Sequence, residues 1–151
     1  MSSSILAILK SLMKQQSMEI KLQRVYYMPK ELKPGVLYVS EEYATAAHLC
    51  PCGCNSKIRT PLGPTDWTFE ETDFGPTLWP SIGNWQRPCQ SHYWIIRGQV
   101  KWADKWTPEQ IASGRKAEEL RRLVYYDTIE RKRRGILRKS WFWLKELVRR
   151  K

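Results

Sequence analysis

Four cysteines are the residues of this chain whose type and spacing most clearly indicate chemistry. Three of them, Cys50, Cys52 and Cys54, fall within five residues, and the fourth is Cys89. Zinc binds such thiolates in a tetrahedron at about 2.3 Å. A secreted disulfide scaffold would instead spread its cysteines, because a bridge stabilises most when it closes a long loop. The cluster therefore predicts a structural zinc held by these four residues in a reducing compartment.

The exact ligand set stays open on the sequence alone. Cysteines at every second position can surround one metal only if the backbone curls, as Gly53 or a bulge would permit. If one cysteine does not bind, His48 or His92 could complete the site, since each lies two or three residues from a cysteine. A redox or free-thiol role is the remaining interpretation.

The pattern of the segments that must position these residues predicts a small antiparallel β-fold. Short runs of alternating or β-branched residues are separated by turn signals. Arg97-Gly98 predicts a tight hairpin in which glycine supplies a positive φ. Residues 43–49 could be a strand or a helix. The expected strands lie around Ile20–Tyr27, Val36–Val39, Lys57–Thr60, Trp67–Phe69, Thr77–Trp79, His92–Ile96 and Gln99–Trp102.

The last third of the chain changes to helix. Thr107-Pro108-Glu109-Gln110 offers a threonine N-cap, proline at the first helical position and glutamine three residues after the cap. We predict a helix to about Arg134, a break at Gly135 and a short amphipathic helix over Trp141–Val148. The fold class is thus α+β, a zinc-stabilised antiparallel β-domain followed by basic helices. The expected divisions are an N-terminal extension (1–17), a Cys/Trp-rich β-domain (18–106) and a basic helical tail (107–151).

Charge is concentrated in that tail. Residues 115–151 contain 14 Lys/Arg and 5 Asp/Glu, or +9, whereas residues 1–114 contain 12 and 10, or +2. A solvated helical face is the simplest interpretation. Basic residues interleaved with Trp141 and Trp143 also suit an anionic partner, either nucleic acid or an acidic protein, or an anionic membrane surface.

Nothing in the chain resembles a membrane-spanning segment. No run approaches the roughly 20 apolar residues that a crossing needs. The apolar Ile5–Leu9 has no basic residues before it and lysines after it, which makes a poor signal peptide. We therefore expect a cytoplasmic protein.

Several short motifs of the β-region resemble a known family. They are His48–Cys54, Thr60-Pro61-Leu62, Pro80–Trp85, Cys89–Ile95 and Val100-Lys101-Trp102. Together they resemble domain of unknown function 6527, a small cysteine-rich bacterial family associated with ubiquitin-like conjugation operons and phage defence, over about residues 18–103. The resemblance implies a peptidase that processes or removes the ubiquitin-like modifier, using a serine and a histidine. Its implied partners are that modifier and its activating and conjugating enzymes.

The residues that could carry such chemistry lie beside the predicted metal ligands. Acyl transfer needs a nucleophile, a base within hydrogen-bonding reach and donors for the oxyanion. Ser91 and His48 each lie two residues from a cysteine, so a shared metal would bring them together. We predict Ser91 as nucleophile and His48 as base, with His92 as the alternative base. Candidates for the orienting acid are Glu41, Glu42 and Asp66.

A purely structural role competes with catalysis at these positions. A serine and a histidine beside a zinc ligand often only hold the ligand loop in place. The alternative function is therefore a non-catalytic zinc-binding adaptor or a nucleic-acid-binding module.

Overall fold

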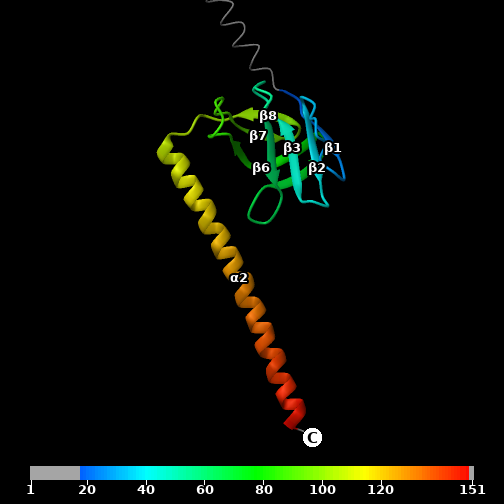
Figure 1. The fold of residues 1–151 in the computed structure, drawn as a ribbon, viewed down its shortest axis with the longest axis vertical. Helices are drawn as coiled ribbons and strands as arrows, with labels where there is room; N and C mark the ends of the chain where they lie inside the picture. The colour runs from blue at the N-terminus through cyan, green and yellow to red at the C-terminus, as the bar shows by residue number, and fades with distance from the viewer. Residues whose placement is uncertain (1–17, 150–151) are drawn as a thin grey trace, which may run out of the picture. The chain divides into compact units, whose positions relative to one another are not determined.

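The structure, a computed structural model, describes residues 18–149 (Figure 1). It divides into a β-unit that ends at Lys105 and a helical unit that begins at Trp106. The expected N-terminal extension lies outside the described residues.

The β-unit consists of two four-stranded sheets. The first has the order β1 (Lys21–Arg24), β2 (Val36–Ser40), β3 (Thr45–Leu49) and β4 (Lys57–Pro61). The second has the order β5 (Thr68–Thr72), β6 (Gly75–Gly83), β7 (His92–Ile96) and β8 (Gln99–Trp102). Every neighbouring pair is antiparallel except β1 and β2, which run parallel because residues 25–35 return the chain before β2 begins. The predicted fold class is confirmed, and the ambiguous segment 43–49 contains a strand.

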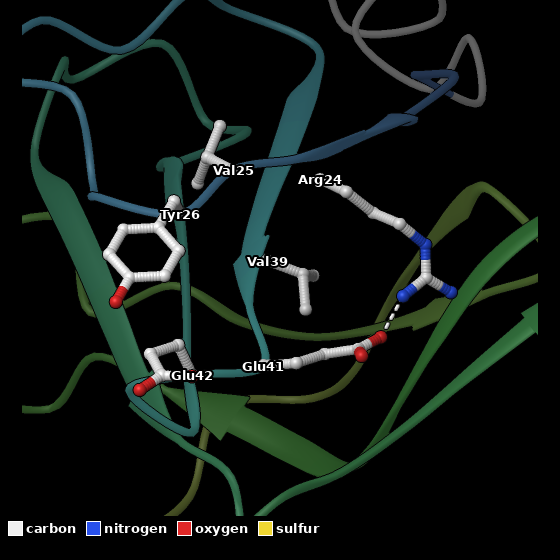
Figure 2. Close-up of a pocket in the computed structure, with 6 residues that line it drawn as sticks. All are labelled: Arg24, Val25, Tyr26, Val39, Glu41 and Glu42. Atoms are coloured by element: carbon white, nitrogen blue, oxygen red, sulfur yellow. Dashed lines mark hydrogen bonds and ion pairs between the residues drawn. The ribbon is translucent and has the colours of Figure 1, made fainter.

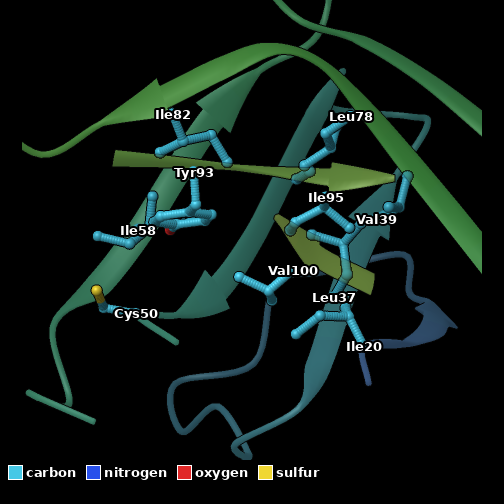
Figure 3. Packing of buried hydrophobic residues seen from close by; sticks show 11 residues of the cluster. Ile20, Leu37, Val39, Cys50, Ile58, Leu78, Ile82, Tyr93, Ile95 and Val100 are labelled. Carbon is cyan, nitrogen blue, oxygen red and sulfur yellow. The ribbon is translucent and has the colours of Figure 1, made fainter. Parts of the chain in front are cut away.

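One hydrophobic cluster joins the two sheets. Burial alternates along β4, where Ile58 and Thr60 are buried and the residues between and beside them are exposed, as expected for a strand with one face inward. Cys50 belongs to the cluster and lies at its edge in Figure 3. The segment that contains Cys50, Cys52 and Cys54 therefore begins with a residue buried in the core. The cluster contains Ile20, Leu37, Val39, Ala46, Cys50, Ile58, Leu78, Ile82, Tyr93, Ile95 and Val100.

The predicted hairpin forms between β7 and β8. Ile96 pairs with Gln99, so Arg97 and Gly98 are the two turn residues. Both have positive φ, 50° and 72°, which is the conformation of a two-residue turn whose twist matches the strands. His92 is the first residue of β7, at the end of the strand opposite to this turn.

The helical unit contains one helix, α2 (Pro108–Arg149), of 42 residues. Its start is capped as predicted: the Gln110 amide donates to the Thr107 hydroxyl (3.3 Å), and the Thr107 amide donates to the Gln110 side chain (2.8 Å). The predicted break at Gly135 is wrong. A single glycine costs only about 1 kcal/mol in a helix, and the ion pairs Arg131–Asp127 and Arg134–Glu130 support the preceding turns. Within the described residues, no helix is both long and apolar enough for a membrane crossing.

Candidate functional site

The four cysteines come together at one end of the first sheet. Cys50 follows β3 directly, and their sulfur atoms all lie within 4.8 Å of one another. The Cys50–Cys52 and Cys54–Cys89 sulfur distances are 3.3 Å and 3.7 Å. Sulfurs in a zinc tetrahedron of about 2.3 Å bonds lie about 3.8 Å apart. All four are free thiols, and the group could hold a metal ion.

The backbone of the first cysteine block curls, as a shared site requires. The amide of Gly53 donates to the carbonyl of Cys50 (3.2 Å), and Gly53 has a φ of 85°. The amide of Cys50 donates to the carbonyl of Ser56 (2.8 Å), which closes the loop. The left-handed conformation at Gly53 is one that other residues adopt only with strain, so the glycine is what lets three cysteines face one point.

The protonation of the thiols differs across the cluster. Burial raises the pKa of Cys50, and burial together with the Cys50 side chain raises the pKa of Cys52 to about 12. Hydrogen bonds from Ser56 lower the pKa of Cys54 to about 6. Metals bind the thiolate form. The two raised thiols would therefore stay protonated near neutral pH unless a cation lies beside them, and a bound metal would supply that charge.

Ser91 lies against the cysteines. Its hydroxyl is buried, 3.1 Å from the sulfur of Cys50 and 3.6 Å from that of Cys89. The side-chain amide of Asn84 donates to the same hydroxyl (2.7 Å), and the backbone amide of Asn84 donates to the Ser91 carbonyl (2.9 Å). These contacts let the Ser91 hydroxyl donate to the Cys50 sulfur, which stabilises charge on the sulfur.

His48 lies in the core beneath the cysteines. It is fully buried, and its Nε2 is 2.7 Å from the hydroxyl of Tyr93. Its Nδ1 has no hydrogen-bond partner among the described residues. Burial lowers the pKa of His48 to about 4, so the ring is neutral at pH 7. The residue predicted as base thus contacts Tyr93 across the core.

His92, unlike His48, contacts a serine hydroxyl, that of Ser81. The Nε2 atom of His92 is 3.0 Å from the Ser81 hydroxyl, and its Nδ1 is 2.8 Å from the backbone carbonyl oxygen of Asp104. A carbonyl only accepts, so Nδ1 carries the ring proton when the imidazole is neutral. Nε2 then has the lone pair and accepts the hydrogen bond from Ser81. This is the order of nucleophile, base and orienting group found in serine hydrolases.

Two tryptophans flank the His92 ring. The ring centroids of Trp85 and Trp94 lie 4.9 Å and 5.6 Å from that of His92. Trp85 reaches this position because Gly83 has no side chain: a Cβ there would lie 2.4 Å from the indole nitrogen. The tryptophans restrict the ring's orientation, and the His92 side chain is almost completely buried.

The local irregularity of β6 places Ser81. The pairing of β6 with β7 shifts register between Leu78 and Ile82, and such bulges redirect side chains next to many active sites. Ser81 itself is half-buried. The sequence alone does not single out Ser81, because it lies eight residues from the nearest cysteine, Cys89, whereas Ser91 and His48 each lie two residues from one. The signal available was the serine within the Pro80–Trp85 motif.

The candidate orienting acids lie in two places. Glu41 and Glu42 line a separate cavity of about 390 Å³, where Glu41 is ion-paired with Arg24 (Figure 2). Asp66 comes two residues before Thr68, which pairs with Trp79. Asp66 itself lies in the turn before β5, where its backbone amide donates to the carbonyl of Gly63 (3.2 Å). Its role as an orienting acid stays a prediction.

A comparison with protein families bears on this geometry. One family model, described as bacterial ubiquitination-like system serine protease (BubE), matches residues 24–103, just over half of the chain. The chain belongs to this family. The matched region contains all four cysteines, Ser81, Ser91 and both histidines, and it ends before α2.

The BubE match confirms the predicted link to ubiquitin-like conjugation and the predicted peptidase function at the level of the family. The family model that matches is named BubE and not domain of unknown function 6527. No curated protein and no solved structure matches the chain.

Proposed function

We propose that this chain is a serine peptidase that processes the ubiquitin-like modifier of its system, with Ser81 as the nucleophile and His92 as the base. The observation that carries the proposal is the Ser81–His92 hydrogen bond of 3.0 Å, with Nδ1 of the same ring held by the Asp104 carbonyl. The BubE membership supports a serine mechanism. The modifier's activating and conjugating enzymes would act in the same pathway.

The chemistry follows from the proton positions. His92 Nε2 removes the hydroxyl proton as Ser81 Oγ bonds to the carbonyl carbon of the scissile bond. The protonated ring then gives that proton to the leaving group, which departs as the bond to carbon breaks. A water molecule then gives a proton to the same nitrogen as its oxygen bonds to the acyl carbon. The bond from that carbon to Ser81 Oγ breaks, Oγ takes the proton from the ring, and a carboxylic acid is released. The Asp104 carbonyl stabilises the imidazolium by accepting from Nδ1.

The strand that carries Ser81 also offers a place for an extended substrate. β5 pairs with β6 only as far as Trp79, so the described strands leave β6 unpaired on that edge at residues 80–83. The Asn84 backbone amide donates to the carbonyl of Ser91, the residue before β7. Amides alternate in direction along a strand, so the preceding Gly83 amide faces the opposite, unpaired edge. A peptide could add there as a further strand, which would bring its scissile bond beside Ser81.

The metal in the cysteine cluster is, in this proposal, a structural zinc bound by Cys50, Cys52, Cys54 and Cys89. A site with four protein ligands has no open position for a substrate or water, so it would stabilise the fold and take no part in the reaction. Ser91 would then hold the ligand loop through its bonds to Asn84 and Cys50. His48 would serve as a core residue.

The experiment is a processing assay with a matched pair of serine variants. The full chain is incubated with the ubiquitin-like protein of its own system, extended at its C-terminus. Ser81→Ala should lower kcat/KM by about 10⁴-fold, with zinc content and circular dichroism unchanged. Ser91→Ala, the control, should keep most of the activity.

The opposite pattern would return the nucleophile to Ser91, as the sequence predicted. Full activity in both variants would exclude both serines as the nucleophile. No cleavage of any such substrate by the wild type would favour the zinc-binding adaptor.

A further inference from the structure

The C-terminal half of α2 exposes large apolar side chains. Ile136, Leu137, Trp141 and Trp143 are each 60–65% exposed. Single exposed apolar residues are ordinary on protein surfaces, but a contiguous group marks an interaction site. These four lie within eight residues of one helix.

The exposed residues share one side of the helix. Residues seven apart lie nearly above one another, and residues four apart are neighbours on the same face. At about 100° per residue, Ile129, Ile136 and Trp143 lie within about 40° of one another on the helix surface. Leu137 and Trp141 lie about 80° and 120° round the helix from Ile129, so the five residues span an arc of about 160°. They form an apolar stripe, defined here by these five residues.

The positive charge of the chain lies in the same segment. Residues 131–151 contain ten Lys/Arg and one Asp/Glu, or +9, whereas residues 107–130 contain four and five, or −1. Two of the ten basic residues, Arg131 and Arg134, pair with Asp127 and Glu130. Most of the basic residues therefore accompany the apolar stripe and are not balanced by acidic neighbours in the sequence.

We propose that this half of α2 binds an anionic lipid surface and lies in the plane of the membrane interface. The apolar stripe would enter the boundary between headgroups and acyl chains, and the basic residues would contact lipid phosphates. Indole rings favour that boundary, because each has an apolar body and a polar N–H. The peptidase would thereby be held close to a membrane.

Two other partners fit these observations less well. Nucleic acid would neutralise the charge but would leave isoleucine and leucine in water. A second copy of the helix would cover the stripe but would bring two segments of +9 together, which costs electrostatic energy. A lipid surface satisfies the apolar and the basic residues at once.

The test is co-sedimentation of the full chain with vesicles. The chain should bind vesicles of phosphatidylcholine with phosphatidylglycerol far more than vesicles of phosphatidylcholine alone, and added salt should weaken binding. Trp141→Gln with Trp143→Gln, which leaves the charge unchanged, should weaken binding about tenfold or more. Phe74→Gln removes an aromatic side chain that is 74% exposed on the β-unit and is the matched control.

Several outcomes would overturn the proposal. Unchanged vesicle binding by the double tryptophan variant would mean that charge alone attracts the helix. Absent binding by the wild type would exclude a lipid partner. A wild-type dimer that the tryptophan variant dissociates would assign the stripe to a second copy. Tighter binding to a DNA duplex, unaffected by the tryptophan changes, would assign the segment to nucleic acid.

Discussion

Two serines of this β-unit have the same chemistry and opposite surroundings. The hydroxyl of Ser91 lies among sulfur atoms and the Asn84 amide, whereas that of Ser81 faces an imidazole nitrogen. An imidazole can take a proton at neutral pH, and an amide N–H cannot. If Ser81 is the nucleophile, as we propose, the comparison teaches that distance along the chain from the cysteine cluster is a poor guide to reactivity, because the partner of the hydroxyl decides it.

Removal of the metal should have the largest effect on folding, and it should disturb the region around Ser91 first. Metal binding energy is folding energy, about 10 kcal/mol or more for structural zinc sites. Chelation should therefore unfold the β-unit, and Cys89→Ser should cost as much as Cys50→Ser. Circular dichroism with zinc analysis measures both. A metal-free chain that stays folded and unfolds in one cooperative transition would show that the thiols need no ion.

Substitution of the two histidines should have the next largest effect. It should distinguish the Ser81 region, where activity should be lost, from the Ser91 region, where stability should be lost. His92→Ala should lower kcat/KM by about 10⁴-fold and keep the zinc. His48→Ala leaves a cavity and removes the hydrogen bond between the imidazole and the Tyr93 hydroxyl, so it should lower the free energy of unfolding by about 2–4 kcal/mol. Its activity per folded molecule should change little. The reverse pattern would make His48 the base.

A methyl group at Gly83 should have a smaller effect that is confined to the Ser81 region. The added Cβ must displace Trp85 from its place beside the His92 ring. A misplacement of about 1 Å can cost 10²-fold in rate, so Gly83→Ala should lower kcat by about that factor. Gly135→Ala is the matched control, because nothing lies within 4 Å of its added methyl. Equal activity of both variants would show that Trp85 does not position the base.

Loss of the Ser91 hydroxyl should have the smallest effect. Ser91→Ala removes a hydrogen bond to a sulfur and leaves the Asn84 amide without that partner, which costs about 1–3 kcal/mol of stability. Thermal unfolding of the zinc-bound chain measures this cost. A Ser91→Ala chain that is fully stable but inactive would reverse the roles assigned to the two serines.

Local patterns in the sequence were sufficient for several parts of the structure. The grouping of Cys50–Cys54, the Arg97-Gly98 turn and the Thr107 cap each depend on residues close together in the chain. The one distant member of the cysteine cluster, Cys89, could be included because four thiols suit one zinc.

Other parts depend on tertiary packing, which no local pattern reports. The Ser81–His92 pair exists because β6 pairs with β7 and shifts register before Ile82. The burial of His48 depends on its contact with Tyr93, 45 residues away. The helix α2 continues through Gly135 because favourable neighbouring turns outweigh one unfavourable residue, and the glycine alone does not report that balance.

The most direct test of the central claim is covalent labelling of the full, zinc-bound chain with a fluorophosphonate. This reagent phosphonylates a serine hydroxyl that a neighbouring base has activated, and it needs no knowledge of the substrate. We predict one label per chain on Ser81, as located by peptide mass spectrometry, with labelling lost in His92→Ala and retained in Ser91→Ala. A label on Ser91, or none on a chain that cleaves its modifier, would contradict the assignment of Ser81 and His92.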